Sequence, residues 1–547
     1  MNANNNRQAT ASEESLKRIF TIPEDPHSTL SIIEEKLSQD LAGFLGDHIV
    51  AKETPLTEIE TWFQGHKIPD SPKFISDYTD EIMQNLVAHS VHTSSPAFIG
   101  HMTSAMPYFV LPLTKLMAGL NQNLVKIETS KAFTPMERQV LGMLHHLVYQ
   151  QGSNFYHNWM HSDGHSLGAF CSGGTIANIT ALWTARNTLL KADGDFKGVA
   201  NEGLVAALRH YQYQDLVILT SERGHYSLSK AADLLGIGRD NIIAVETDEN
   251  NKVDVKLMRK KALELQQQHI KVMAIVGVAG TTETGNVDPL TELAALACEI
   301  ECHFHVDAAW GGASLLSEKY RHLLAGIELA DSVTIDAHKQ MYVPMGAGMV
   351  LFKDPMLTHA ITHHAEYILR KGSKDLGRQT LEGSRPGMAM LVHACLKIIG
   401  LSGYEILINN SIEKARYFAS LISAHNDFEL VTEPELCLLT YRYVPKKVQL
   451  ALTAAYETKD FKRAQTINKL LDELTKFIQK HQREHGKSFV SRTRISPVQH
   501  QRQPIIVFRT VLANPLTTQD ILNNVLEEQA QIALEDTQFL PELYKVL

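Results

Sequence analysis

The sequence predicts an α/β protein with a largely parallel sheet that is covered by helices on both faces. Short apolar runs rich in β-branched residues recur between residues 216 and 352, and helical patterns such as VDVKLMRKKALELQQQ separate most of them. Strands that are apolar throughout are typical of parallel sheets whose two faces are both buried. The chain has 547 residues, which is long enough for more than one domain.

The expected strands alternate with helices along the chain. They are the runs at 216–220, 242–246, 272–279, 303–306, 332–335 and 347–352. The connection before the last run is short, so we expect this strand to run antiparallel to its neighbour.

We divide the chain into three parts. Residues 1–119 are expected to form a polar tail and a helical segment, residues 120–385 a large α/β domain, and residues 386–547 a smaller α+β domain. The first part includes an amphipathic helical pattern within 28–65. The last part combines a helical pattern at 464–482 with the apolar runs LCLLTYRYV and PIIVFRTVLAN.

Composition argues against several classes of protein. Asp and Glu outnumber Lys and Arg by 61 to 52, and the resulting net charge of −9 argues against a dedicated nucleic-acid binder. No uninterrupted apolar run reaches about 18 residues, so we expect no helix that spans a membrane. The five cysteines show no disulfide or zinc-site spacing, which indicates reduced thiols in a cytoplasmic protein.

A run of histidines raises the question of a metal site. His157, His161 and His165 lie four residues apart, a spacing that could bind zinc on a helix. The Gly and Asp between them indicate a loop instead, and no HExxH motif occurs. We therefore expect no metal.

Two charged residues stand at the tips of neighbouring predicted strands. Asp307 ends the run HFHV, and Lys339 follows the run SVTI. Ligands of parallel α/β sheets bind beyond the carboxyl ends of the strands, so one ligand could contact both side chains. A buried lysine is a nucleophile for carbonyl groups, and a buried carboxylate requires a cation. A salt bridge between Asp307 and Lys339 is an equally good alternative on the pattern alone.

A glycine turn supplies a third feature. The stretch FCSGGTIANITALWTAR opens a long helix, where backbone N–H groups and the hydroxyls of Ser172 and Thr175 favour an anion. A simple helix cap is the alternative. A phosphate site, an amine for an aldehyde and a carboxylate for a protonated pyridine nitrogen together match pyridoxal phosphate.

Five motifs extend this interpretation to a family. The chain closely resembles the group II pyridoxal-phosphate-dependent amino-acid decarboxylases over roughly residues 90–535. The motifs that carry the resemblance, in order and correctly spaced, are HVDAAWGG, DAHKQM, SGGTIANITAL, SERGHYSLSKAADLLGIG and GTTETGNVDPL. The resemblance implies the fold-type-I architecture with a mostly parallel seven-stranded sheet. It also implies pyridoxal 5'-phosphate as the cofactor and a homodimer with the active site at the subunit interface.

The resemblance assigns a role to each matching position. Lys339 corresponds to the lysine that forms a Schiff base with the cofactor, and Asp307 to the partner of the pyridine nitrogen. His225 corresponds to the catalytic imidazole that stacks on the ring, Ala309 to the small residue on the opposite ring face, and Thr282 to a residue near a cofactor oxygen. The positions that match phosphate-binding residues are Ser172, Gly173, Gly174, Thr175 and His338.

Two features depart from the family pattern. Asp336 stands at a phosphate-binding position where several relatives carry Asn, and an ionised carboxylate there would repel the phosphate. The stretch EYILRKGSKDLGRQTLEGSRPG contains no tyrosine after Tyr367, whereas relatives carry a mobile-loop tyrosine that protonates the substrate Cα. The proton donor is therefore open between His225 and a water molecule.

The resemblance implies decarboxylation of an acidic L-amino acid. Arg509 aligns with the arginine that binds the substrate α-carboxylate in glutamate decarboxylases, and His101 can bind a second carboxylate. We expect L-aspartate, converted to β-alanine and CO₂, before L-glutamate, converted to 4-aminobutanoate. A decarboxylase of aromatic or sulfinic amino acids and a non-catalytic pyridoxal-fold binding or scaffold protein are the alternatives.

Overall fold

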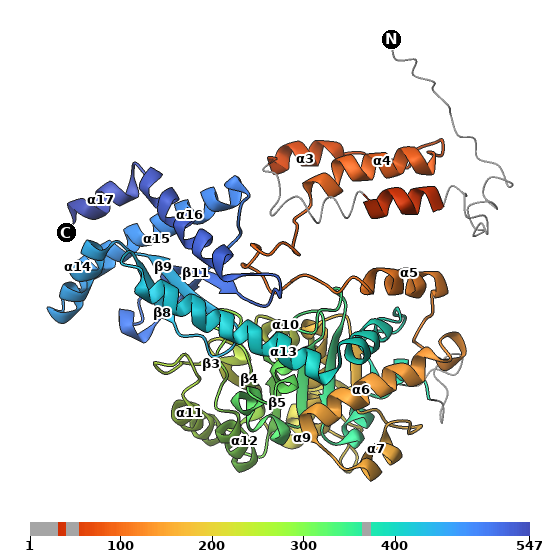
Figure 1. Cartoon of the computed structure of the whole chain (residues 1–547). Coiled ribbons are helices and arrows are strands. Elements are labelled where there is room, and N and C mark those ends of the chain that lie inside the picture. The colour runs from red at the N-terminus through yellow and green to blue at the C-terminus, as the bar shows by residue number, and fades with distance from the viewer. Residues whose placement is uncertain (1–30, 40–53, 364–373, 547) are drawn as a thin grey trace.

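The computed structural model describes residues 31–39, 54–363 and 374–546 of the chain. A large α/β body carries a seven-stranded sheet, and a four-stranded sheet with its own helices lies beside it (Figure 1). Short N-terminal helices stand apart from both (Figure 1).

The large sheet has the strand order β1-β7-β6-β5-β4-β2-β3. The strands are β1 (Gly168–Cys171), β2 (Asp215–Ser221), β3 (Ile242–Val245), β4 (Ile270–Val278), β5 (His303–Asp307), β6 (Ser332–Asp336) and β7 (Gly348–Phe352). From β3 to β6 neighbouring strands pair in parallel, whereas β7 pairs antiparallel with both β6 and β1. The predicted strands and the reversed last strand are confirmed. The short strand β1 was not predicted, because its four residues show no clear pattern.

Helices cover both faces of this sheet. One face carries α8 (Gly174–Leu189), α9 (Val199–Tyr211) and α10 (Ser227–Leu234), and the other carries α6 (Phe133–Tyr149), α11 (Val255–Gln267) and α12 (Leu290–Glu299). Leu216 and Ile218 of β2 pack with the first group, and Val217 and Leu219 with the second, because successive strand residues point to opposite faces. The central strands are therefore buried on both faces, whereas the edge strand β3 is partly exposed.

The smaller sheet is antiparallel throughout, in the order β10-β11-β9-β8. Its strands are β8 (Phe428–Thr432), β9 (Leu438–Tyr443), β10 (Ser491–Ile495) and β11 (Ile505–Val511), and its helices are α14 (Lys446–Glu457), α15 (Phe461–His485), α16 (Gln519–Glu535) and α17 (Phe539–Lys545). The predicted helix at 464–482 lies within α15. The α+β character of this part is confirmed, and the exact boundaries of the three domains stay predictions.

One long helix connects the two sheets. α13 (Ala389–Ala424) bends at Gly400, whose φ of 66° interrupts the helical geometry, and it packs on α6, β8 and β9. Among the described helices, α13 is long and apolar enough to cross a membrane by length and composition alone. Length and composition alone do not test the expectation that no helix spans a membrane, so this expectation stays a prediction. In the fold, its Tyr404 and Phe418 are buried in the protein core.

The N-terminal part contains helices at 31–39, α3 (Leu56–Trp62) and α4 (Ile75–Asn85), followed by α5 (Val110–Leu120). The predicted amphipathic pattern within 28–65 thus includes two separate helices, and its residues 28–30 and 40–53 lie outside the described residues, as does the polar tail. The remaining short helices are α7 (Ser153–Trp159) and the 3₁₀ turns η1 (Val87–His89), η2 (Ile127–Thr129), η3 (Arg239–Asn241), η4 (Gly311–Leu316), η5 (Arg321–Leu324), η6 (Ile327–Leu329), η7 (Pro355–Ile361), η8 (Leu376–Gln379) and η9 (Val498–His500).

Candidate active site

A cavity of about 550 Å³ opens beyond the carboxyl ends of the central strands. Its walls include all thirteen residues that the sequence singled out, namely His101, Ser172, Gly173, Gly174, Thr175, His225, Thr282, Asp307, Ala309, Asp336, His338, Lys339 and Arg509. They come from segments up to about four hundred positions apart, and the topology brings them together because parallel strands end at one edge of the sheet. Their individual roles stay predictions.

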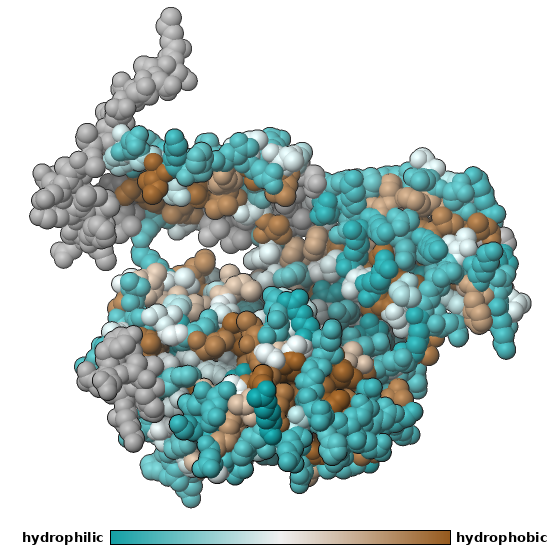
Figure 2. Space-filling model, turned by 180° about the vertical axis from the view of Figure 1, so that it is seen from behind, coloured by the Kyte–Doolittle hydropathy of each residue, from teal (hydrophilic) through white to brown (hydrophobic). Residues whose placement is uncertain are grey.

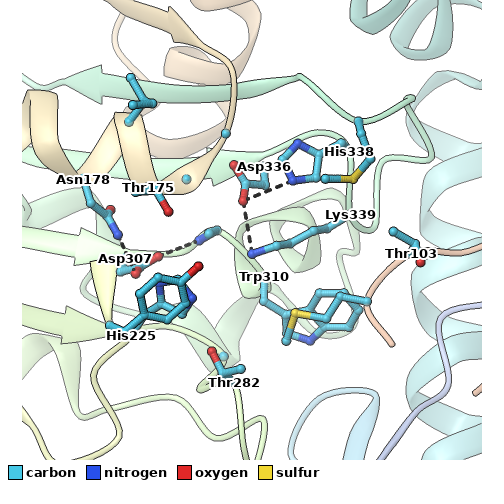
Figure 3. A pocket seen from close by; sticks show the side chains of 18 of the residues that line it. Thr103, Thr175, Asn178, His225, Thr282, Asp307, Trp310, Asp336, His338 and Lys339 are labelled. Atoms are coloured by element: carbon cyan, nitrogen blue, oxygen red, sulfur yellow. Dashed lines mark hydrogen bonds and ion pairs between the residues drawn. The ribbon is translucent and has the colours of Figure 1, made fainter. Parts of the chain in front are cut away.

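Lys339 forms an ion pair with Asp336. Its Nζ lies 3.1 Å from Asp336 Oδ2, and His338 Nε2 lies 3.6 Å from the same oxygen. Both pairs follow from the chain, since β6 ends at Asp336 and the next turn carries His338 and Lys339. In the described part of the chain, Lys339 forms no salt bridge with Asp307, so that alternative is not what the structure contains. Figure 3 shows Asp307 and Lys339 both directed into the same cavity.

Asp307 is held firmly at the tip of β5. Its side chain is buried, with Oδ2 accepting a hydrogen bond from Asn178 Nδ2 at 2.8 Å and Oδ1 accepting from the Ala309 backbone N–H at 3.2 Å (Figure 3). Neither donor is a cation. The carboxylate therefore keeps its charge available for a cationic group of a ligand.

His225 has a defined tautomer. Its Nδ1 accepts from the Ser227 backbone N–H at 3.3 Å and lies 2.8 Å from Ser227 Oγ. The ring proton is therefore on Nε2. Burial, and the positive charge of Lys339, lower the pKa of His225, although Asp307 opposes this shift. The imidazole is consequently neutral near pH 7.

The glycine turn before α8 lies close to β6. A side chain on Gly174 would come within 2.8 Å of Asp336 Oδ2 and 3.2 Å of the Ala309 Cβ, so only glycine keeps this space open. The Ser172 backbone N–H donates to Glu382 Oε2 at 2.8 Å. A carboxylate of the protein thus already occupies one of the donors that the sequence assigned to a phosphate.

Arg509 on β11 reaches the cavity from the smaller sheet. Its Nε donates to the Thr282 backbone oxygen at 2.6 Å, and Nη1 donates to the Gly100 oxygen at 3.3 Å and to Ser491 Oγ at 3.4 Å. Burial lowers the pKa of Arg509 to about 10, so the guanidinium remains charged at neutral pH. Within the described residues, Nη2 donates no hydrogen bond and is left for a ligand.

His101 faces the same space as a neutral donor. The Thr103 backbone N–H donates to its Nδ1 at 3.2 Å, so the ring proton is on Nε2. Burial, Arg509 and Lys339 all lower the pKa of His101. It can therefore donate a hydrogen bond to an anion, but it does not add a positive charge near pH 7.

Sequence reasoning missed several residues of the site. Asn178, Tyr226 and Trp310 line the cavity, and Glu382 contacts its glycine turn. Asn178 could have been found, because it lies one helical turn after Gly174 and so faces the same way. The histidines of the sequence HNWMHSDGH lie elsewhere, and no group of metal-ligating side chains occurs among the described residues.

The cavity fits pyridoxal phosphate. An amine, a buried carboxylate without a cationic partner, a neutral imidazole and a glycine turn at a helix N-terminus surround one space. Asp336 Oδ1 is buried without a hydrogen-bond partner in the described structure, and this acceptor is the feature beside the turn that suits a phosphate least. The fold and the cavity define an enzyme of the fold-type-I pyridoxal phosphate class.

Comparison with known proteins identifies the family. The pyridoxal-dependent decarboxylase conserved domain matches residues 59–444. The aspartate 1-decarboxylase of Aliivibrio fischeri is 64% identical over 542 residues, covering 99% of this chain and 98% of that protein. The acidic amino acid decarboxylase GADL1 of Xenopus tropicalis is 30% identical over 373 residues, covering 67% of this chain and 68% of that protein. The chain therefore belongs to the pyridoxal-dependent decarboxylases, and its cofactor is pyridoxal phosphate.

Solved structures agree with this fold. The crystal structure of mouse CSAD in apo form has a TM-score of 0.76 at 23% identity and covers 92% of this chain and 99% of its own. The structure of Oryza sativa TDC with PLP and tryptamine has a TM-score of 0.78 at 17% identity, with 94% and 99% covered. The predicted fold-type-I architecture is confirmed.

Proposed function

We propose that the chain decarboxylates an acidic L-amino acid, with L-aspartate as the preferred substrate and β-alanine and CO₂ as the products. The observation that carries this proposal is the placement of Arg509 and His101 in the same cavity as Lys339. A guanidinium and an imidazole N–H can bind two carboxylates of one short substrate. The names of the relatives from Aliivibrio fischeri and Xenopus tropicalis support an acidic substrate.

Each of these cavity residues has a distinct role in the proposed reaction. When bound, pyridoxal phosphate supplies an electron sink for the pair of electrons left by the departing carboxylate. Lys339 is the nucleophilic amine, and Asp336, whose Oδ2 lies 3.1 Å from Lys339 Nζ, orients it. Asp307 holds a positive charge at the ring nitrogen, and Arg509 fixes the α-carboxylate through its free Nη2.

The source of the proton for Cα is part of the proposal. Tyr367 and its surroundings lie outside the described residues. His225 carries its ring proton on Nε2 and lines the cavity. We assign it the donor role ahead of a water molecule, because its Nδ1 is held by Ser227 and its N–H is therefore fixed at Nε2.

A product assay tests the substrate proposal. The purified enzyme, reloaded with pyridoxal phosphate, is incubated separately with aspartate, glutamate, cysteine sulfinate and tyrosine, and the amines are quantified. We expect the highest kcat/KM for aspartate and a lower value for glutamate. Turnover of tyrosine alone would refute an acidic substrate.

We also propose that the protein is a homodimer. Exposed apolar side chains lie on two helices that contact each other, namely Leu111, Leu116 and Leu120 of α5 and Ile398, Leu401 and Ile406 of α13. Figure 2 shows further hydrophobic residues on the separate N-terminal helices, above an open gap. A second copy of this chain would cover these surfaces.

Light scattering tests this assembly. A Leu116→Glu/Leu401→Glu variant is expected to have half the mass of the parent, whereas Leu450→Glu, at a similarly exposed position on α14, leaves the mass unchanged. A parent protein with the mass of one chain would refute the dimer.

We also propose that the protein is cytoplasmic. All five cysteines are free, and Cys171, Cys395 and Cys437 are buried as thiols. This usage fits a reducing compartment. Cell fractionation with an antibody to the chain tests the assignment, and recovery outside the cytoplasmic fraction would refute it.

A further inference from the structure

A chain of buried hydrogen bonds runs behind the cavity to Asp307. Asn178 Nδ2 donates to Asp307 Oδ2 at 2.8 Å, and Asn178 Oδ1 lies 3.1 Å from His305 Nε2. His305 Nδ1 lies 2.8 Å from Ser332 Oγ, which in turn lies 2.7 Å from His303 Nε2. Asn178, His305 and Ser332 are at most 1% exposed, so water does not compete for these contacts.

The direction of every bond in this chain is determined. A carboxylate only accepts, so Asn178 must turn its NH₂ group to Asp307 and its oxygen to His305. That oxygen only accepts as well, so the proton of His305 is on Nε2, and Nδ1 accepts from the Ser332 hydroxyl. Each donor therefore polarises the next in the same sense, which strengthens the final bond to Asp307.

Asn178 also contacts Ser227, the residue that holds the His225 ring. Asn178 Nδ2 donates to Ser227 Oγ at 2.9 Å, and Ser227 lies 2.8 Å from His225 Nδ1. If the amide of Asn178 turned over, it would present oxygen to both Asp307 and Ser227. The orientation of this one amide therefore fixes the carboxylate and the imidazole together.

We propose that His305 is a positioning residue, which acts through the amide of Asn178 to hold Asp307 as the anionic partner of the cofactor's ring nitrogen. This inference rests on the predicted role of Asp307 in the proposed function. His305 does not line the cavity and touches neither cofactor nor substrate. Burial lowers the pKa of His305, so the imidazole stays neutral and its tautomer is fixed by its two partners.

The ring nitrogen itself provides the test. Enzyme emptied of cofactor is reloaded with pyridoxal phosphate labelled with ¹⁵N in the ring, and the ¹⁵N chemical shift reports whether that nitrogen is protonated. His305→Leu is expected to move the shift toward the unprotonated value and to raise the cofactor dissociation constant roughly tenfold. His305→Gln is expected to restore both, because its amide N–H can occupy the place of Nε2.

Thr334→Val is the matched control. Thr334 is fully buried on β6 opposite Asp307, and its hydroxyl has no partner within the described residues. The substitution changes a polar core position next to Asp307 without touching the hydrogen-bond chain. It should leave the ¹⁵N shift and the dissociation constant unchanged.

Asp307→Asn distinguishes a failure of the proposal for His305 from a failure of the role assigned to Asp307. If Asp307→Asn moves the ¹⁵N shift and His305→Leu does not, the proposal for His305 is overturned and the role of Asp307 stands. If neither variant moves it, the role of Asp307 fails as well. Should His305→Leu not fold, Ser332→Ala replaces it, because that change removes the donor to His305; a shift equal to that of the parent would then count against the proposal.

Discussion

The ammonium group of Lys339 pairs with Asp336, three residues earlier in the chain, at a distance of 3.1 Å. Asp307 on the adjacent strand instead accepts hydrogen bonds from the neutral donors Asn178 and Ala309. We therefore expect the two acids to have separate roles. Asp336 would orient the amine of Lys339, and Asp307 would pair with a cationic group of the ligand.

Lys339→Ala is expected to abolish amine formation, because no other lysine of the described structure lines the cavity. It also leaves the buried Asp336 without its cation, which should lower the free energy of unfolding by roughly 3 kcal/mol. Denaturant unfolding measures this loss. The Lys339→Ala/Asp336→Asn variant should recover most of the stability but none of the activity; turnover by either variant would remove Lys339 from the mechanism.

Asp336→Asn is expected to bind pyridoxal phosphate about tenfold more tightly, since a carboxylate beside the glycine turn repels the phosphate. A fluorescence titration of the emptied enzyme gives the dissociation constant. Asp240→Asn, on the exposed turn η3, makes the same change in net charge far from the cavity and is the control. Weaker binding by Asp336→Asn would show that the ion pair with Lys339 matters more than the repulsion.

Arg509→Met is expected to raise KM for the substrate about 10- to 100-fold, because a charged hydrogen-bond donor to the carboxylate is lost. Steady-state kinetics with aspartate measure the change. Arg494→Met, at an exposed position on the neighbouring strand β10, should have the parent's KM. An unchanged KM for Arg509→Met would exclude this residue as the carboxylate clamp.

His101→Ala is expected to reduce the preference for aspartate over glutamate, whereas His101→Gln should retain most of it. The reason is that His101 acts as a neutral donor through Nε2, and a glutamine amide can also donate. The ratio of kcat/KM values for the two substrates measures the preference. Equal ratios in the parent and in His101→Ala would remove His101 from substrate recognition.

Glu429 links stability to pH in the smaller sheet. Burial alone would raise the pKa of Glu429, but Arg442 and His500 lower it to about 2. A carboxyl group with a lowered pKa in the folded state stabilises the protein above its unfolded pKa of about 4.3 and loses this contribution as pH falls toward 2. The contribution is about 3 kcal/mol at neutral pH.

Denaturant unfolding at several pH values tests this link. Glu429→Gln should lose stability at pH 7, because the fully buried Arg442 keeps its charge without an anion. The deficit relative to the parent should shrink as the pH falls below about 5. The exposed Glu457→Gln serves as control, and a deficit that does not depend on pH would contradict the assignment.

Short contiguous motifs carried most of what the sequence could predict. Asp307 and Lys339 were placed correctly because each follows an apolar strand, and the carboxyl ends of parallel strands share one edge. The reversal of β7 followed from the short connection before it. The assignment of Arg509 and His101 to the site depended on the family resemblance. Nothing in the local pattern of either segment indicates that the two residues line one cavity.

Contacts between distant segments could not be predicted from the sequence. Glu382 lies 210 positions from Ser172, and His305 lies 127 positions from Asn178. A lone histidine in an apolar strand is typical of a core residue. Only the orientation of the Asn178 amide shows that His305 is connected to Asp307. The sequence also does not decide the structure at Gly400, because a glycine there is compatible with the end of a helix as well as with a kink inside one.

The contact between Glu382 and Ser172 has a consequence for how the enzyme acquires its cofactor. The protein's own carboxylate sits on a backbone donor of the glycine turn, so loading exchanges one anion for another. A phosphate could use this donor only after Glu382 has left it. The rate of reconstitution would therefore level off at high cofactor concentration, at a ceiling that the departure of this single side chain sets.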